Sequence, residues 1–164
     1  MNTQKVQTAI ELLRANSQGL RDRKSPFHLS ASAMVFEGGK GIFIRHPYLH
    51  TILLPAGHVE PHEMPIDCAI REFTEETGLV LKTSPNSLID VNIIDIPANP
   101  QKDEGAHQHL DFRYWFSSIE PHTKYRPELP VFQLKRREAP AEFQPYFALI
   151  WSLKWEIMIV AIYK

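Results

Sequence analysis

Two segments of the chain place apolar residues at helical spacing. Residues 3–15 carry theirs at Val6, Ala9, Ile10 and Leu13. This pattern predicts an N-terminal helix. In the second segment one mostly apolar helical face is formed by Ile66, Ala69, Ile70, Phe73 and Thr77. Pro65 suits the first position of this second helix, and Gly78 suits the left-handed residue after its last turn.

Shorter apolar runs predict β-strands. Residues 29–36 and 42–45 flank a glycine-rich turn, which indicates a β-hairpin. Further strands are expected at residues 51–54, 88–96, 107–117 and 131–134. The second helix is therefore entered from a strand through a loop, an arrangement that commonly holds ligands in α/β layers.

The predicted strand at 107–117 alternates between two kinds of side chain. Its even positions are largely apolar, and its odd positions include His107, His109, Asp111 and Arg113. The polar face is interpreted either as a solvated outer surface or as a face that contacts substrate or supports the site. A zinc site from His107, His109 and Asp111 is less favoured, because alternate residues on one strand rarely close around an ion unaided.

The C-terminal segment after about residue 135 is ambiguous. Large apolar residues from Trp151 onward alternate with polar ones, which favours a strand, but the apolar excess would suit a buried helix equally. Residues 157–163 form an uncharged run that is too short to span a bilayer.

Composition narrows the class of protein. A length of 164 residues suits one domain, residues 1–164, and 43% apolar with 23% charged residues is an ordinary globular balance. The formal net charge of −1 gives no reason to expect a nucleic-acid partner. The single cysteine, Cys68, fits a reducing compartment, and the N-terminus lacks signal-peptide character. We therefore expect a cytoplasmic protein without a membrane anchor.

Three acidic residues gather on the predicted second helix. Glu72, Glu75 and Glu76 fall opposite its apolar face, with Arg71 beside them. Like charges at this spacing destabilise a helix, and the negative end of the helix dipole is close. A hard divalent cation would offset both effects, whereas the simpler interpretation is a solvated acidic surface.

The spacing around these residues resembles a known motif. Gly57 is followed after five residues by Glu63, and after seven more by Arg71-Glu72-Phe73-x-Glu75-Glu76-x-Gly78-Leu79. This resembles the Nudix box at every defining position, so the chain is identified as similar to Nudix hydrolases. The resemblance implies an α/β fold, an α/β/α sandwich around a mixed β-sheet.

The resemblance also implies an activity. Family members cleave a nucleoside diphosphate linked to another group X, by attack of water on phosphorus, with Mg²⁺ or Mn²⁺ as cofactor. The implied metal ligands are the carbonyl of Gly57 and the carboxylates of Glu72, Glu75 and Glu76. By analogy Arg71 orients Glu72, and Glu63 supports the loop or binds an outer ion. The alternative is a catalytically silent domain that binds a nucleotide and regulates a partner.

Several assignments stay open at this level. The general base is either a box glutamate or one of the downstream candidates Asp103, Glu104, Glu120 and Glu128. Candidates for substrate binding are Arg45, His109, Asp111 and Arg113. Met64 stands where a helix-capping Ser or Thr is frequent, so that cap is lost or replaced. The identity of the small-molecule diphosphate and a homodimeric state are not decided by the sequence.

Overall fold

The computed structural model describes residues 2–82, 86–100, 105–120 and 125–152, and its elements follow the predicted order closely. The helices are α1 (Thr3–Ala15), α2 (Pro65–Thr77), the 3-10 turn η2 (Ala141–Phe143) and a helix over residues 144–152. The strands are β1 (Phe27–Glu37), β2 (Lys40–Arg45), β3 (Ile52–Leu53), β4 (Ala56–His58), β5 (Asn86–Ile96), β6 (His107–Phe116) and β7 (Val131–Lys135). The predicted hairpin is the antiparallel pair β1 and β2.

The strands form one mixed sheet in the order β3-β2-β1-β6-β5, with β4 paired to β1 and β7 paired to β2. Only the β1–β6 pairing among these is parallel, with His28 opposite His109 and Ser32 opposite Arg113. The short strand β4 runs antiparallel to β1 and brings Gly57 opposite Ala31. The residues before α2 are therefore fixed to the centre of the sheet.

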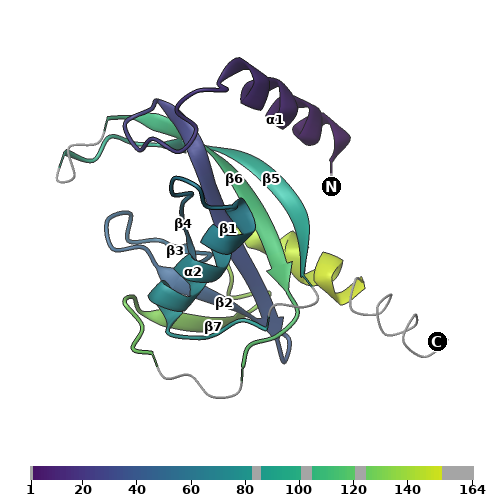
Figure 1. Ribbon diagram of the computed structural model, residues 1–164. Helices are drawn as coiled ribbons and strands as arrows, with labels where there is room; N and C mark the ends of the chain where they lie inside the picture. The colour runs from purple at the N-terminus through teal and green to yellow at the C-terminus, as the bar shows by residue number, and fades with distance from the viewer. Residues whose placement is uncertain (1, 83–85, 101–104, 121–124, 153–164) are drawn as a thin grey trace.

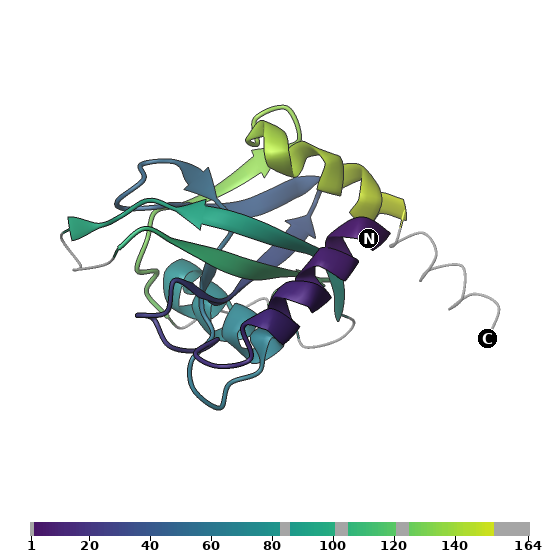
Figure 2. The same ribbon diagram turned by 90° about the horizontal axis from the view of Figure 1, so that it is seen from above.

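Helices cover both faces of the sheet, so the predicted α/β/α sandwich is confirmed (Figure 1). On one face α1 and α2 pack against alternate residues of β1 and β6; this core includes Ala9, Leu29, Ala31, Phe73 and Leu110. On the other face η2 and the following helix cover a second core with Met34, Trp115, Phe143 and Ile150. Figure 2 shows α2 and the C-terminal helix on opposite sides of the strands.

The C-terminal segment, which the sequence leaves open between a strand and a buried helix, is described only in part. Residues 144–152 are helical, with Ile150 buried and Trp151 exposed. Most of the alternating run that favours a strand follows Ser152. Residues 153–164 lie outside the described part of the chain. No helix in the described part is long and apolar enough to cross a membrane.

Candidate active site

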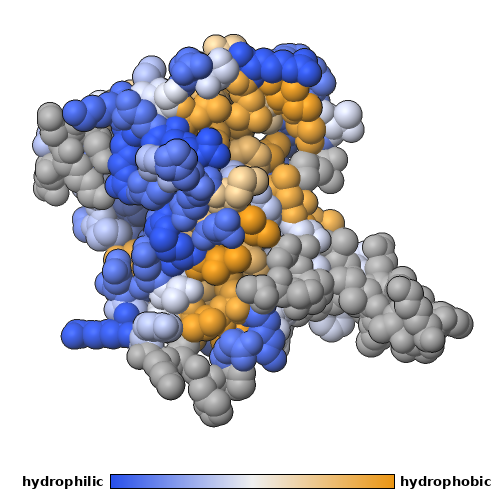
Figure 3. Space-filling model, viewed as in Figure 1, coloured by the Kyte–Doolittle hydropathy of each residue, from blue (hydrophilic) through white to orange (hydrophobic). Residues whose placement is uncertain are grey.

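The acidic helix α2 begins and ends as its sequence predicts. Pro65 occupies the first turn, and the helix stops at Gly78, whose φ of 68° is left-handed. Met64 is the N-cap residue and makes no side-chain capping bond, as expected for that substitution. Cys68, Ala69 and Phe73 bury one side of the helix against the sheet. The opposite side presents its carboxylates, and hydrophilic residues gather over this part of the surface (Figure 3).

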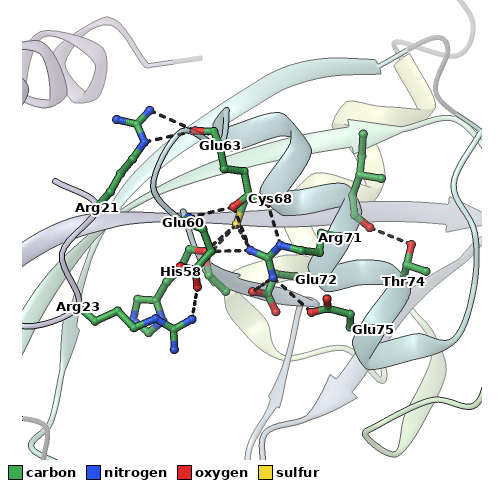
Figure 4. Close-up of polar contacts among 12 residues, drawn as sticks. Arg21, Arg23, His58, Glu60, Glu63, Cys68, Arg71, Glu72, Thr74 and Glu75 are labelled. Carbon is green, nitrogen blue, oxygen red and sulfur yellow. Dashed lines mark hydrogen bonds and ion pairs between the residues drawn. The ribbon is translucent and has the colours of Figure 1, made fainter.

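Arg71 is the centre of a network of charge-assisted hydrogen bonds (Figure 4). Its Nε and Nη2 donate to the two carboxylate oxygens of Glu63 at 2.8 and 3.0 Å. Its Nη1 donates to Glu72 at 2.6 Å and to Glu75 at 3.2 Å. Such a bidentate fork restricts the orientation of both partners. Arg71 therefore holds Glu72 in place and ties α2 to the preceding loop.

Glu63 also contacts the backbone of the loop that precedes α2. Its carboxylate accepts the backbone N–H of Glu60 at 2.9 Å, which closes the loop before α2. Hydrogen bonds from Arg71 are the main reason that the pKa of Glu63 lies below its usual value, although burial opposes them. Glu63 is thus ionised, and both of its carboxylate oxygens accept hydrogen bonds from the protein. These contacts suit a residue that supports the loop before α2.

Glu72 and Glu76 lie in a less favourable environment for negative charge. Burial raises the pKa of Glu76 to about 8, and the nearby carboxylates of Glu72, Glu128 and Glu75 add to this, against a 3.0 Å hydrogen bond from the N–H of Ala56. Burial also raises the pKa of Glu72, although Arg71 opposes the shift. Two partly buried carboxylates with raised pKa values are typical of a site that takes a cation.

Gly57 lies directly against Glu72. A Cβ atom at position 57 would be 2.1 Å from the Cδ and Oε1 atoms of Glu72, so a larger residue would displace that carboxylate. The backbone of Gly57 is therefore adjacent to a carboxylate, and Glu75 and Glu76 follow Glu72 on the same helix. Carboxylate and carbonyl oxygens are the hard donors that fit Mg²⁺ or Mn²⁺.

Among the candidate bases, the structure brings Glu128 to α2. The N–H groups of Glu128 and Leu129 donate to the carbonyls of Glu75 and Glu76, each at 3.2 Å. An open groove beside the helix is lined by Arg71, Thr74, Glu75, Tyr125, Arg126 and Glu128. Glu120 instead follows the bridge between Leu81 and Ile119, and its N–H donates to Val80. Asp103 and Glu104 lie outside the described residues.

The polar face of β6 lies on the side of the sheet that is opposite α2. Asp111 and Arg113 are only 2% and 6% exposed, so their interpretation as a solvated outer surface is wrong. Asp111 accepts hydrogen bonds from Ser30 at 3.1 Å and Ser32 at 2.8 Å. Helix residues from the C-terminal region cover this face, and alternation alone could not reveal that both faces are buried.

Arg113 joins this face to the C-terminal helix. Its guanidinium donates to Asp111 at 3.2 Å, to Tyr146 at 3.1 Å and to Glu142 at 2.9 Å. The hydroxyl of Tyr146 in turn bonds Asp90, whose carboxylate also accepts from Lys5 of α1. Every charge in this network has an oppositely charged protein partner, and the side chains of Arg113 and Asp111 are more buried than that of Arg71.

The other two substrate-binding candidates lie in different places. Arg45 is exposed on β2, with its guanidinium 5.4 Å from the ring centroid of Phe132. His109 lies in a cluster with His28, His58 and His107 on the face opposite α2. Sequence reasoning missed His28, Ser30 and Ser32, although their alternation with apolar residues in one strand was a signal for polar contacts on that face.

Comparisons with known proteins identify the family of this chain. A family model for the NUDIX domain matches residues 26–145. The chain is 49% identical over 147 residues to the probable DHNTP pyrophosphohydrolase of Lactococcus lactis subsp. cremoris (strain MG1363), and the match covers 89% of this chain and 87% of that protein.

Solved structures show the same fold at lower identity. The MutT NUDIX hydrolase from Burkholderia pseudomallei has a TM-score of 0.53 at 19% identity, covering 70% of this chain and 87% of that one. The E. coli ORF135 protein has a TM-score of 0.54 at 14% identity, covering 78% and 91%. The family match, the 49% identical relative and the box geometry together show that this chain belongs to the Nudix hydrolases, enzymes that act on phosphorus-containing acid anhydrides.

Proposed function

We propose that this chain is a metal-dependent pyrophosphohydrolase whose substrate is DHNTP, dihydroneopterin triphosphate. The observation that carries the chemistry is the set of carboxylates on α2, packed against Gly57 with raised pKa values at Glu72 and Glu76. The substrate rests on the Lactococcus relative, whose name states that activity as probable and which is 49% identical over most of both chains. The reaction would release diphosphate and leave a pterin monophosphate.

The carboxylate site fits Mg²⁺ or Mn²⁺, held by Gly57, Glu72, Glu75 and Glu76. When bound, the ion would neutralise charge on the phosphates and make an attacking water more acidic. A phosphate-bearing substrate would also supply oxygen ligands of its own, since Mg²⁺ binds through a few carboxylates and substrate phosphates.

The chain's own residues position these groups. Arg71, itself held by Glu63, orients Glu72, and the N–H of Ala56 orients Glu76. We assign Glu128 as the general base, because its loop is hydrogen-bonded to the end of α2 and its carboxylate borders the open groove. A carboxylate oxygen of Glu128 would accept the proton of the water that attacks phosphorus.

A substrate panel with Mg²⁺ tests the assignment. DHNTP, nucleoside triphosphates, ADP-ribose and dinucleotide polyphosphates are compared by kcat/KM, with released diphosphate or nucleotide as the readout. We expect DHNTP to give the highest value. A nucleoside triphosphate with a kcat/KM about tenfold above that of DHNTP would refute DHNTP as the substrate, while the assignment as a hydrolase would stand. Tight binding of the panel without any turnover would instead support the silent-domain alternative.

The base is tested with a matched pair of variants. Glu128→Gln should lower kcat by about 10²–10⁴-fold, the usual contribution of a general base, and flatten the acidic limb of the pH–rate profile. Glu120→Gln removes a carboxylate from the neighbouring segment and should change kcat by less than about threefold. Equal effects of the two substitutions would remove Glu128 from this role.

A further inference from the structure

Four histidines from three strands converge on the face of the sheet opposite α2. They are His28 on β1, His58 on β4, and His107 and His109 on β6. The pairing register explains the convergence, because His28 lies opposite His109, and His58 lies opposite Ser30, two residues farther along β1. One ligand nitrogen from each ring lies within 4.8 Å of all the others. Alternate residues of one strand rarely close around an ion unaided, but these four ligands come from three strands, so that objection to a zinc site does not apply to them.

The hydrogen bonds of two rings fix which nitrogen can bind a metal. Nδ1 of His28 is 3.0 Å from the carbonyl oxygen of Ser25, and Nδ1 of His107 is 2.7 Å from that of Gly105. A carbonyl oxygen only accepts, so each Nδ1 carries the proton, and in the neutral ring Nε2 carries the lone pair. A backbone carbonyl is one of the usual partners of the second nitrogen in a metal-binding histidine.

The Nε2 atom of His109 lies within hydrogen-bond distance of two other ring nitrogens. Nε2 of His109 lies 3.1 Å from Nε2 of His58 and 3.0 Å from Nε2 of His107. A neutral His109 has at most one proton on that nitrogen to share between two neighbours. These distances are close to the separation of about 3.3 Å between ligands in a tetrahedral zinc site with bonds of about 2.0 Å.

We propose that His28, His58, His107 and His109 form a tetrahedral site for a divalent transition-metal ion, which we take to be Zn²⁺. Four neutral imidazole nitrogens suit zinc and its neighbours in the first transition row, whereas Mg²⁺ prefers oxygen ligands. His28 is almost fully buried, and the other three rings are partly accessible, which gives an ion a path of entry.

A site closed by four protein ligands is structural in kind. It would join β1, β4 and β6, and the short strand β4 also carries Gly57 immediately before His58. The carbonyl of His58 accepts a hydrogen bond from Arg71 at 3.1 Å. The ion would therefore restrain the strand from which the carboxylate site on the other face is built.

The test uses the full chain, freed of metal by chelation and titrated with Zn²⁺ in excess Mg²⁺. We expect one equivalent to bind by calorimetry and to raise the thermal midpoint by several degrees. Co²⁺ in place of Zn²⁺ should give the strong visible absorption of tetrahedral coordination. Zinc-free protein that binds no ion, or Co²⁺ spectra of weak octahedral type, would leave a hydrogen-bonded histidine cluster only and overturn the proposal.

Variants locate the ion. His107→Gln, at a partly accessible position, should lower zinc affinity by at least about 100-fold, since even changes to groups behind the ligands cost 10–100-fold. His50→Asn is the matched control, because His50 is exposed and its φ of 54° suits asparagine. Glu76→Gln should leave zinc binding intact. Loss of the ion in Glu76→Gln with retention in His107→Gln would place zinc at the carboxylates and refute this site.

Discussion

Arg71 and Arg113 are each surrounded by acidic side chains, yet the two networks differ in balance and burial. Arg71 contacts Glu63, Glu72 and Glu75 beside an open groove, and the carboxylates of Glu72 and Glu76 keep raised pKa values. Arg113 lies under the C-terminal helix, where its partner Asp111 also accepts from two serines and its partner Tyr146 leads on to the Asp90–Lys5 pair. A large excess of carboxylates over cations beside an open groove suits a site for a ligand, whereas a buried network in which the charges are more nearly balanced suits support of the fold.

The largest effect that separates the two networks should come from Arg113→Ala. Removing this guanidinium leaves Asp111 buried without its cation, which should lower the free energy of unfolding by about 3–5 kcal/mol. Urea unfolding measures the change. Arg45→Ala, at an exposed position with one ring contact, is the control and should cost less than about 1 kcal/mol. A stable Arg113→Ala protein with a raised KM would instead support the predicted substrate contact.

Glu76→Gln should differ from Arg113→Ala, because it should lower turnover and leave the stability nearly unchanged. We expect kcat to fall at least about 100-fold, equivalent to about 2.7 kcal/mol, because an implied metal ligand is lost. The metal-free protein should keep its thermal midpoint or gain slightly, since one of several crowded carboxylates is gone. Glu11→Gln on the exposed side of α1 is the isosteric control. A parent-like rate in Glu76→Gln would show that the metal binds elsewhere.

Gly57→Ala tests the close contact in the carboxylate network with a single methyl group. The added Cβ would displace the end of the Glu72 side chain, so kcat/KM should fall about tenfold, or about 1.4 kcal/mol, while the fold is kept. Gly105→Ala is matched to it, because a Cβ there meets no atom within 4 Å. Steady-state kinetics at saturating Mg²⁺ gives the comparison, and identical values for both variants would contradict the packing of Glu72 on Gly57.

The smallest effect concerns the pH dependence of the metal-free protein. The pKa of Glu76 is about 8 in the fold against 4.5 when unfolded, so the folded state binds more protons between these values. The resulting stability is complete below about pH 4.5 and is lost as the pH rises through about 8. We expect a total loss of about 1 kcal/mol, because Glu76 keeps some contact with water.

Thermal midpoints across that range measure this loss, with Glu76→Gln as the reference. The variant should lack the Glu76 contribution, and saturating Mg²⁺ should suppress it in the parent. A slope that is identical in parent and variant would assign the pH dependence to another group.

The sequence predicted the helix of the box, its end at Gly78 and its face of carboxylates because these depend on residues within a few turns. It also predicted most strands from local alternation. It could not show that β6 is buried on both faces, since the cover comes from Tyr146 and its helix, far along the chain. The histidine cluster was equally hidden, because only the β1–β6 and β1–β4 registers bring His28 and His58 to His109.

Strand β5 bears on association between copies of this chain. Among the strands that the structure describes, β5 ends the sheet path and pairs only with β6, so it offers a row of backbone groups to another strand. Its pairing is interrupted by an irregularity between Leu88 and Asp90, and the exposed Asp95 places a charge along it. Bulges and charges of this kind oppose edge-to-edge pairing and the aggregation that follows from it. Any association between copies is therefore expected to use another surface, and a disulfide between copies carrying Ile93→Cys would contradict this.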